Sequence, residues 1–150
     1  RCVAAFLSHY SLWKKCRDSG IETQIFEHDA VCVNNMPRNI MYEGCISLGA
    51  PSYGNWVTPS VMGVNPLTSK PYFPGAHAYR VKPAGAISMI QAAKTNAGPT
   101  DVFLSRINFP WLEEYYPWPV IARDNFSTIQ NPQGCIAKHN WKGGINYDIL

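Results

Sequence analysis

The chain has 150 residues, with 13 Lys or Arg against 10 Asp or Glu. The resulting net charge of +3 is small and no basic run is present, so charge alone does not indicate nucleic-acid binding. No apolar stretch reaches the ~18 residues that a membrane span requires. The length favours one domain over residues 1–150, and the 12 Pro and 11 Gly predict the many ordered loops of a site-bearing enzyme.

The cysteines exclude two classes of small domain. They are odd in number and never form a C-x-x-C pair, which rules out zinc-ribbon and redox motifs: Cys2, Cys16, Cys32, Cys45 and Cys135. Scattered cysteines with apolar neighbours predict reduced, buried thiols and a reducing compartment, so we expect a cytoplasmic protein. The chain opens on Arg1 without an initiator Met, which predicts a piece of a longer protein.

The N-terminal segment predicts half of an α/β unit. Apolar residues recur at helical spacing from Val3 to Arg17, and Gly20 suits the residue just past the helix end. A short strand, Glu22 to Phe26, follows, and we expect its apolar end to occupy the centre of a sheet. The Ser8-His9 pair within the helix favours a structural role over a catalytic one.

Two acids come directly after this strand. Glu27 and Asp29 are spaced i and i+2, so strand alternation would place both carboxylates on one side of the strand end. Paired carboxylate oxygens form a hard site that suits Mn²⁺ or Mg²⁺. An exposed turn after the strand is the plainer interpretation, and both stay open here.

The middle of the chain predicts a second strand, a long loop and a binding turn. Cys45 to Gly49 reads as a strand, and Ala50 to Pro74 is either a lid over a pocket or an insertion. In Gly75-Ala76-His77, small residues precede a strand, where backbone can approach a ligand closely. His77 either lines that pocket or packs within the strand. Pro83 suits the first turn of a helix that ends near Asn96.

The C-terminal third contains a second candidate acid. Thr100 is predicted to cap a short helix whose Asp101 stands at the N-terminus, with residues 102–104 facing inward. An aromatic loop from Asn108 to Pro119 and a short strand, Pro119 to Ala122, follow. The basic tail, 138–144, holds His139 and Lys142 beside two glycines that allow the backbone to approach phosphate oxygens.

The ordered set of motifs resembles glycosyltransferase family 25, which includes lipooligosaccharide and procollagen galactosyltransferases. The resemblance covers about residues 3 to 130 and rests on these segments: Phe6-Leu7-Ser8-His9, Leu12-Trp13, Glu27-His28-Asp29-Ala30-Val31, Gly75-Ala76-His77-Ala78-Tyr79, Lys82-Pro83-Ala84-Gly85-Ala86, Pro99-Thr100-Asp101 and Ser127-Thr128-Ile129-Gln130. His28 departs from the family by replacing the middle acid of its Glu-Asp-Asp motif.

The resemblance implies an α/β fold of GT-A type, a Rossmann-like mixed sheet flanked by helices. The N-terminal portion that binds the nucleotide base in GT-A proteins is almost wholly missing here, so a preceding segment or a partner chain would have to supply it. The implied enzyme is a metal-dependent hexosyltransferase. It would use a nucleotide-sugar donor, such as a UDP-sugar, and a saccharide, protein or modified-nucleobase acceptor.

The resemblance also implies a role for each candidate residue. Glu27, Asp29 and the late His139 would hold Mn²⁺ or Mg²⁺, and Lys142 would stabilise the diphosphate leaving group. Asp101 would be the general base of an inverting reaction, with helix capping as the rival role. The alternative function is a non-catalytic sugar- or nucleotide-binding homologue, or a subunit whose site a partner completes.

Overall fold

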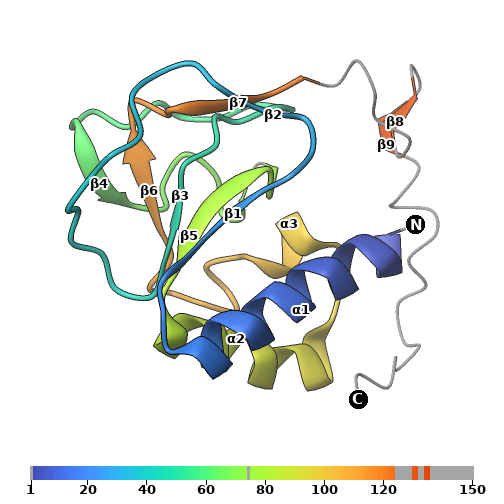
Figure 1. The fold of residues 1–150 in the computed structure, drawn as a ribbon. Coiled ribbons are helices and arrows are strands. Elements are labelled where there is room, and N and C mark those ends of the chain that lie inside the picture. Colours follow the sequence, from blue (N-terminus) through green and yellow to red (C-terminus); the bar gives the residue numbers. More distant parts are fainter. Residues whose placement is uncertain (1, 74, 124–129, 132–133, 136–150) are drawn as a thin grey trace.

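The computed structural model describes residues 2–73, 75–123, 130–131 and 134–135. These residues form three helices and nine strands, arranged as Figure 1 shows. In chain order they are α1 (Cys2–Ser19), β1 (Thr23–Phe26), β2 (Ala30–Cys32), β3 (Cys45–Ser47), β4 (Gly63–Pro66), β5 (Ala78–Val81), α2 (Pro83–Asn96), α3 (Thr100–Phe103), β6 (Glu113–Tyr116), β7 (Val120–Ala122), β8 (Gln130–Asn131) and β9 (Gly134–Cys135). None of the described helices is long and apolar enough to cross a membrane.

A mixed five-stranded sheet in the order β1-β5-β3-β6-β4 forms the centre of the fold. Strands β3 and β6 are parallel, while β1–β5, β3–β5 and β4–β6 are antiparallel. Strands β1, β3 and β6 therefore run in one direction, and their carboxyl ends lie at the same end of the sheet, here called the carboxyl edge. The predicted α/β class with a mixed sheet and helices is confirmed.

All three helices pack on one face of the sheet (Figure 1). Helix α1 forms where predicted, because Phe6, Tyr10, Trp13 and Cys16 recur at helical spacing and are all buried. Their rings meet those of α3 and the following loop edge to face or stacked; Phe103, for example, lies 5.2 Å from Phe6 and 5.5 Å from Trp13 between ring centroids. This aromatic layer anchors α1 beneath the strands.

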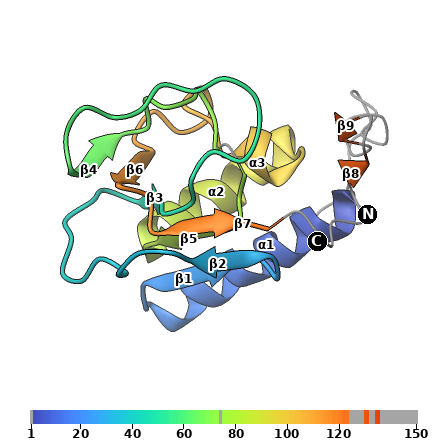
Figure 2. The same ribbon diagram turned by 90° about the horizontal axis from the view of Figure 1, so that it is seen from above.

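The opposite face of the sheet is covered by the two-stranded β2–β7 pair (Figures 1 and 2). Ile46, Leu48 and Ala78 point to this side and pack with Val120 of β7 in a second, smaller core. A parallel bridge between Gly49 and Val120 ties the pair to the end of β3. The loop after β1 is thereby held over the carboxyl edge.

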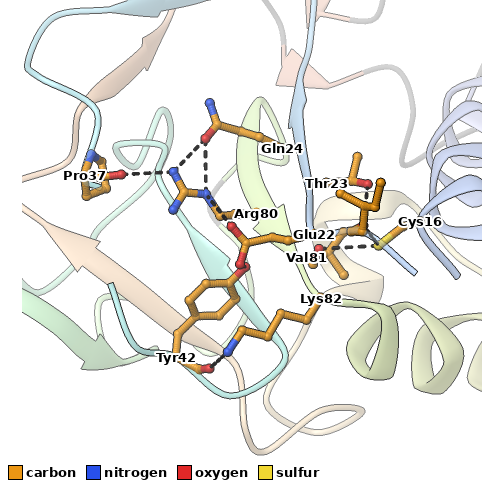
Figure 3. A network of polar contacts seen from close by, with 10 residues as sticks. Cys16, Glu22, Thr23, Gln24, Pro37, Tyr42, Arg80, Val81 and Lys82 are labelled. Atoms are coloured by element: carbon orange, nitrogen blue, oxygen red, sulfur yellow. Dashed lines mark hydrogen bonds and ion pairs between the residues drawn. The ribbon is translucent and has the colours of Figure 1, made fainter. Parts of the chain in front are cut away.

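A polar network on the outer side of β1 and β5 fixes the 37–43 segment (Figure 3). Arg80 bonds the side chain of Gln24 and the carbonyl oxygen of Pro37, and its Nε lies 3.4 Å from Oε1 of Glu22. The Tyr42 hydroxyl donates to Glu22 at 2.6 Å. Arg80 alternates with Tyr79 along β5, so this network faces away from the helices and serves to hold the loop.

Several sequence predictions were wrong. Ile25 and Phe26 lie in the edge strand β1 and not in a central strand, because β1 pairs only with β5 in the described sheet. Ile25 is buried as expected, whereas Phe26 is 44% exposed. Cys32 is exposed, whereas Cys2, Cys16 and Cys45 are buried as predicted.

The C-terminal third also differs from its prediction. The supposed aromatic loop contains β6, whose pairing with β3 and β4 outweighs the flanking prolines. Thr100 is a helical residue and Pro99 is the N-cap of α3; Val102 faces solvent, while Phe103 and Leu104 are buried. The long loop from Ala50 is ordered around buried Leu67 and Phe73 and contains β4, although its Trp56 is exposed.

Candidate functional site

Glu27 stands at the carboxyl edge, directly after β1. Its backbone N–H donates to the carbonyl oxygen of His77 at 2.9 Å, which extends the β1–β5 ladder by one position. Ala30 N–H then bonds back to the Glu27 carbonyl at 3.2 Å and turns the chain into β2. The first predicted acid and the predicted ligand-binding segment, which are far apart in the sequence, are therefore neighbours.

The Glu27 side chain is held by a histidine of α1. Nε2 of His9 lies 3.0 Å from Oε1 of Glu27, and the Glu27 side chain remains 34% exposed. His9 itself is 5% exposed, and its Nδ1 lies 2.8 Å from the hydroxyl of Tyr79. The Trp13 indole donates to that same hydroxyl at 2.8 Å. This buried chain of hydrogen bonds thus ends at the partly exposed carboxylate of Glu27.

The environment of Glu27 favours its ionised form. Burial by itself raises the pKa of this carboxyl group, but the hydrogen bond from His9 lowers it, as do the positive charges that His9, His77 and His28 carry when protonated. The net result is a pKa below the ordinary value of 4.5. Glu27 is a carboxylate at neutral pH and is available to a cation.

Asp29 occupies the turn that follows. Its carbonyl oxygen accepts from the Arg123 N–H at 2.9 Å, which fixes the turn against the end of β7. Its Oδ1 is buried and has no hydrogen-bond donor within the part of the chain that the structure describes. A buried carboxylate oxygen without a donor is costly, and a bound cation is one group that would compensate it.

Binding of Mn²⁺ or Mg²⁺ by the two acids stays a prediction. Within the described residues no group of three or more His, Cys, Asp or Glu side chains could hold a metal ion. Mg²⁺ is commonly bound through one or two carboxylates together with substrate phosphates, so two protein ligands are compatible with a nucleotide-sugar site. The remaining predicted ligand, His139, and the predicted phosphate contact, Lys142, lie outside the described residues.

The predicted binding turn, Gly75 to His77, packs tightly at this edge. His77 is 1% exposed and its ring fills a slot between two glycines: a Cβ at Gly49 would lie 2.4 Å from Nε2, and one at Gly75 would lie 2.7 Å from Nδ1. Gly75 also has φ of +118°, which side-chain-bearing residues rarely adopt. Because Ala76 and His77 are buried, this segment offers a ligand its backbone more than its side chains.

Asp101 is linked to the same region through the long loop. Its Oδ2 accepts from the Tyr53 hydroxyl at 2.6 Å, and its Oδ1 accepts from the Val102 N–H at 2.9 Å, so part of the rival helix-end role is present. The adjacent Ser52 packs beside Gly75. Buried Lys70 lies 4.2 Å from the ring centroid of Tyr53 and bonds its carbonyl oxygen. Asp101 makes no hydrogen bond to Glu27 or Asp29 among the described atoms.

The residues that support the site were not identified from the sequence. The sequence favours a structural role for His9 and does not indicate Tyr79 or Tyr53 as partners of the acids. A helical His followed four residues later by Trp was the available signal, because i and i+4 side chains share one helix face. Only the fold shows that this face meets Tyr79.

Comparisons of this chain with protein-family models, with curated proteins and with solved structures found no match.

Proposed function

We propose that this protein is a metal-dependent glycosyltransferase that moves a hexose from a nucleotide-sugar, such as a UDP-sugar, to an acceptor hydroxyl with inversion. The observation that carries the proposal is the contact between Glu27 and His77. It brings the acidic motif and the glycine-bounded turn together where β1, β3 and β6 end. In open α/β sheets, ligands bind at the carboxyl ends of the strands.

In this proposal the chain's own groups have separate tasks. Glu27 and Asp29 would hold Mn²⁺ or Mg²⁺, which neutralises negative charge on the diphosphate when bound. Asp101 takes the proton from the acceptor hydroxyl as its oxygen bonds the anomeric carbon, and the bond from that carbon to the diphosphate oxygen breaks. Each oxygen of Asp101 accepts one hydrogen bond, which leaves a lone pair on each for this proton.

The departing nucleoside diphosphate carries the electron pair of the broken bond. Lys142 is proposed to stabilise that charge, and His139 to complete the metal ligands. The Gly75–His77 backbone is proposed to approach the donor sugar, because its side chains are turned inward. The acceptor hydroxyl belongs to a saccharide, a protein or a modified nucleobase.

The test is release of nucleoside diphosphate from a panel of nucleotide-sugars, with Mn²⁺ or with a chelator. We expect Mn²⁺-dependent release that falls about a hundredfold in Glu27→Gln, because the charge that holds the cation is removed. Glu43→Gln is the matched control, since Glu43 is an exposed acid away from this edge. Equal release by Glu27→Gln and wild type would contradict the proposal.

A second candidate is a non-catalytic sugar- or nucleotide-binding homologue, or a subunit whose site a partner completes. It is favoured by His28, which places a titratable base beside Glu27 where the resembled family has an acid. Donor binding measured by calorimetry without any turnover would support this candidate over the transferase.

A further inference from the structure

A chain of three hydrogen bonds connects the protein core to the candidate site. Trp13 and His9 lie one turn apart on α1 and both reach the hydroxyl of Tyr79 on β5, each at 2.8 Å. The other ring nitrogen of His9 continues the chain to Glu27 at 3.0 Å. Trp13 and Tyr79 are fully buried and His9 nearly so, so water does not compete along this path.

Donor and acceptor accounting gives each bond a direction. An indole N–H can only donate, so the Tyr79 hydroxyl accepts from Trp13. The single hydroxyl hydrogen is then directed to Nδ1 of His9, which must be unprotonated to accept it. The ring proton of neutral His9 therefore sits on Nε2 and is donated to the Glu27 carboxylate. With this assignment every group in the chain is satisfied.

Other protonation states leave a group unsatisfied. A neutral ring with its proton on Nδ1 would point the Nε2 lone pair at a carboxylate oxygen. A doubly protonated ring would donate to Tyr79, whose own hydrogen has no further acceptor among the described residues. The His9 and Tyr79 rings also stack, with centroids 5.7 Å apart and planes 20° from parallel, which restricts rotation of the imidazole.

We propose that Trp13 and Tyr79 fix His9 as the Nε2–H tautomer, so that His9 positions the Glu27 carboxylate for a divalent cation. The cation part of this inference rests on the proposed function. Trp13, Tyr79 and His9 are positioning residues, because they act through Glu27 and do not themselves reach the ligand. Hydrogen bonds of this kind behind a metal ligand orient it, and their removal typically weakens metal affinity by about 10- to 100-fold.

The first experiment reads the tautomer directly and needs no metal. Two-bond ¹H–¹⁵N correlation of ¹⁵N-histidine-labelled protein, near pH 8 where an ordinary imidazole is neutral, should show His9 with a protonated Nε2 and an unprotonated Nδ1. Tyr79→Phe should alter this pattern. The control Tyr10→Phe should not, because Tyr10 is a buried tyrosine of α1 outside the chain. A protonated Nδ1 in the wild type, or an unaltered pattern in Tyr79→Phe, overturns the inference.

The second experiment measures Mn²⁺ affinity by electron paramagnetic resonance of the free ion. We expect Tyr79→Phe to bind Mn²⁺ about tenfold more weakly than wild type and Tyr10→Phe, although the Tyr79 hydroxyl bonds His9 and Trp13 and not Glu27 among the described residues. Equal Mn²⁺ affinity of wild type and Tyr79→Phe overturns the positioning role.

Two conservative variants of His9 test the positioning role even if the Tyr79→Phe protein does not fold. In His9→Gln the side-chain amide nitrogen takes the place of Nε2, so this variant should retain most Mn²⁺ affinity. In His9→Asn the amide nitrogen takes the place of Nδ1 only, so this variant should lose Mn²⁺ affinity. The reverse order overturns the positioning role. A wild-type protein with the expected tautomer but no Mn²⁺ binding refutes the metal role and the proposed function, and leaves the tautomer assignment standing.

Discussion

His9 and Glu27 meet at 3.0 Å across the boundary between the helical layer and the carboxyl edge of the sheet. The contact joins a nearly buried imidazole to a carboxylate that is partly open to solvent. The packing of the core and the geometry of the candidate site around Glu27 therefore depend on the same side chains.

The acid sensitivity of the fold should depend in part on Glu27. Its pKa is lower in the folded protein than the ordinary 4.5, so the unfolded chain binds more protons as the pH falls below that value. The contribution of Glu27 to the free energy of unfolding is therefore present above pH 4.5 and is lost as the pH falls through the folded-state pKa. Urea unfolding at a series of pH values should show wild type and Glu27→Gln converging in acid; a constant difference would contradict this.

The alkaline limit should depend on Tyr42. Burial first, and then its hydrogen bond to Glu22, raise the pKa of this hydroxyl above the ordinary 10.0. The folded protein then holds the proton that the unfolded chain loses, so stability is complete below pH 10 and declines above it. Tyr42→Phe should show a shallower decline in unfolding free energy above pH 10. An unchanged slope would remove Tyr42 as a cause.

Asp101 allows catalytic and structural roles to be separated. If it is the base, Asp101→Asn should lower kcat by about 10²- to 10⁴-fold. The Asn amide oxygen can still accept from the Val102 N–H, so the unfolding free energy should fall by only about 0.5–1.5 kcal/mol, the size of one weakened hydrogen bond. Steady-state kinetics and urea unfolding of this variant distinguish the two. Tyr53→Phe is the companion, because it removes the donor to Asp101 and leaves the acid in place.

The aromatic layer between α1 and α3 should dominate stability. Phe103 is 2% exposed and its ring lies against Phe6, Trp13 and Phe109. Phe103→Ala should lower the unfolding free energy by about 3–5 kcal/mol, because it leaves a cavity. Its neighbour Val102 is 46% exposed, so Val102→Ala should change it by less than about 0.5 kcal/mol. Equal effects of the two variants in chemical denaturation would contradict the packing described.

Two glycines provide a matched test of close packing beneath the sheet. A Cβ at Gly85 of α2 would lie 2.4 Å from the carbonyl oxygen of Gly44, a backbone atom that cannot move aside easily. Gly85→Ala should therefore destabilise the protein by about 1–3 kcal/mol. Gly98→Ala meets no atom closer than 4.0 Å and should be neutral or stabilising by about 0.4–1 kcal/mol. Thermal unfolding of both variants measures this difference, and an equal stability of the two would contradict the close packing at Gly85.

Local patterns predicted the helices better than the pairing of strands. The periodic apolar residues of α1 and Pro83 at the start of α2 are local signals, and both helices form there. The place of β1 at an edge depends on β5 pairing with β3, which no segment encodes by itself. β6 was missed because its neighbours Pro110 and Pro117 suggest a loop, while its strand state is stabilised by partners on both sides.

The candidate site was predictable to a similar degree. Glu27 and the Gly75–His77 turn could be chosen from residue type and order, and the fold brings them together. The partners of the acids could not be chosen from the sequence, because His9 and Tyr79 become neighbours only when α1 packs against β5. Asp101 was chosen from its place at a helix start, but its bond to Tyr53 depends on how the long loop folds back.

The pairing of β1 with β5 also bears on how the protein folds. β2, β3 and β4 lie between these two strands in the sequence, so the pair closes a long loop before it gains its hydrogen bonds. Contacts of this kind slow folding, and α1 and α2 can form earlier because their contacts are local. The surroundings of Glu27 are thus completed late in refolding, when Tyr79 reaches the face of α1. During refolding, Trp13 fluorescence and the capacity to bind a ligand at the carboxyl edge should therefore appear in the same kinetic phase.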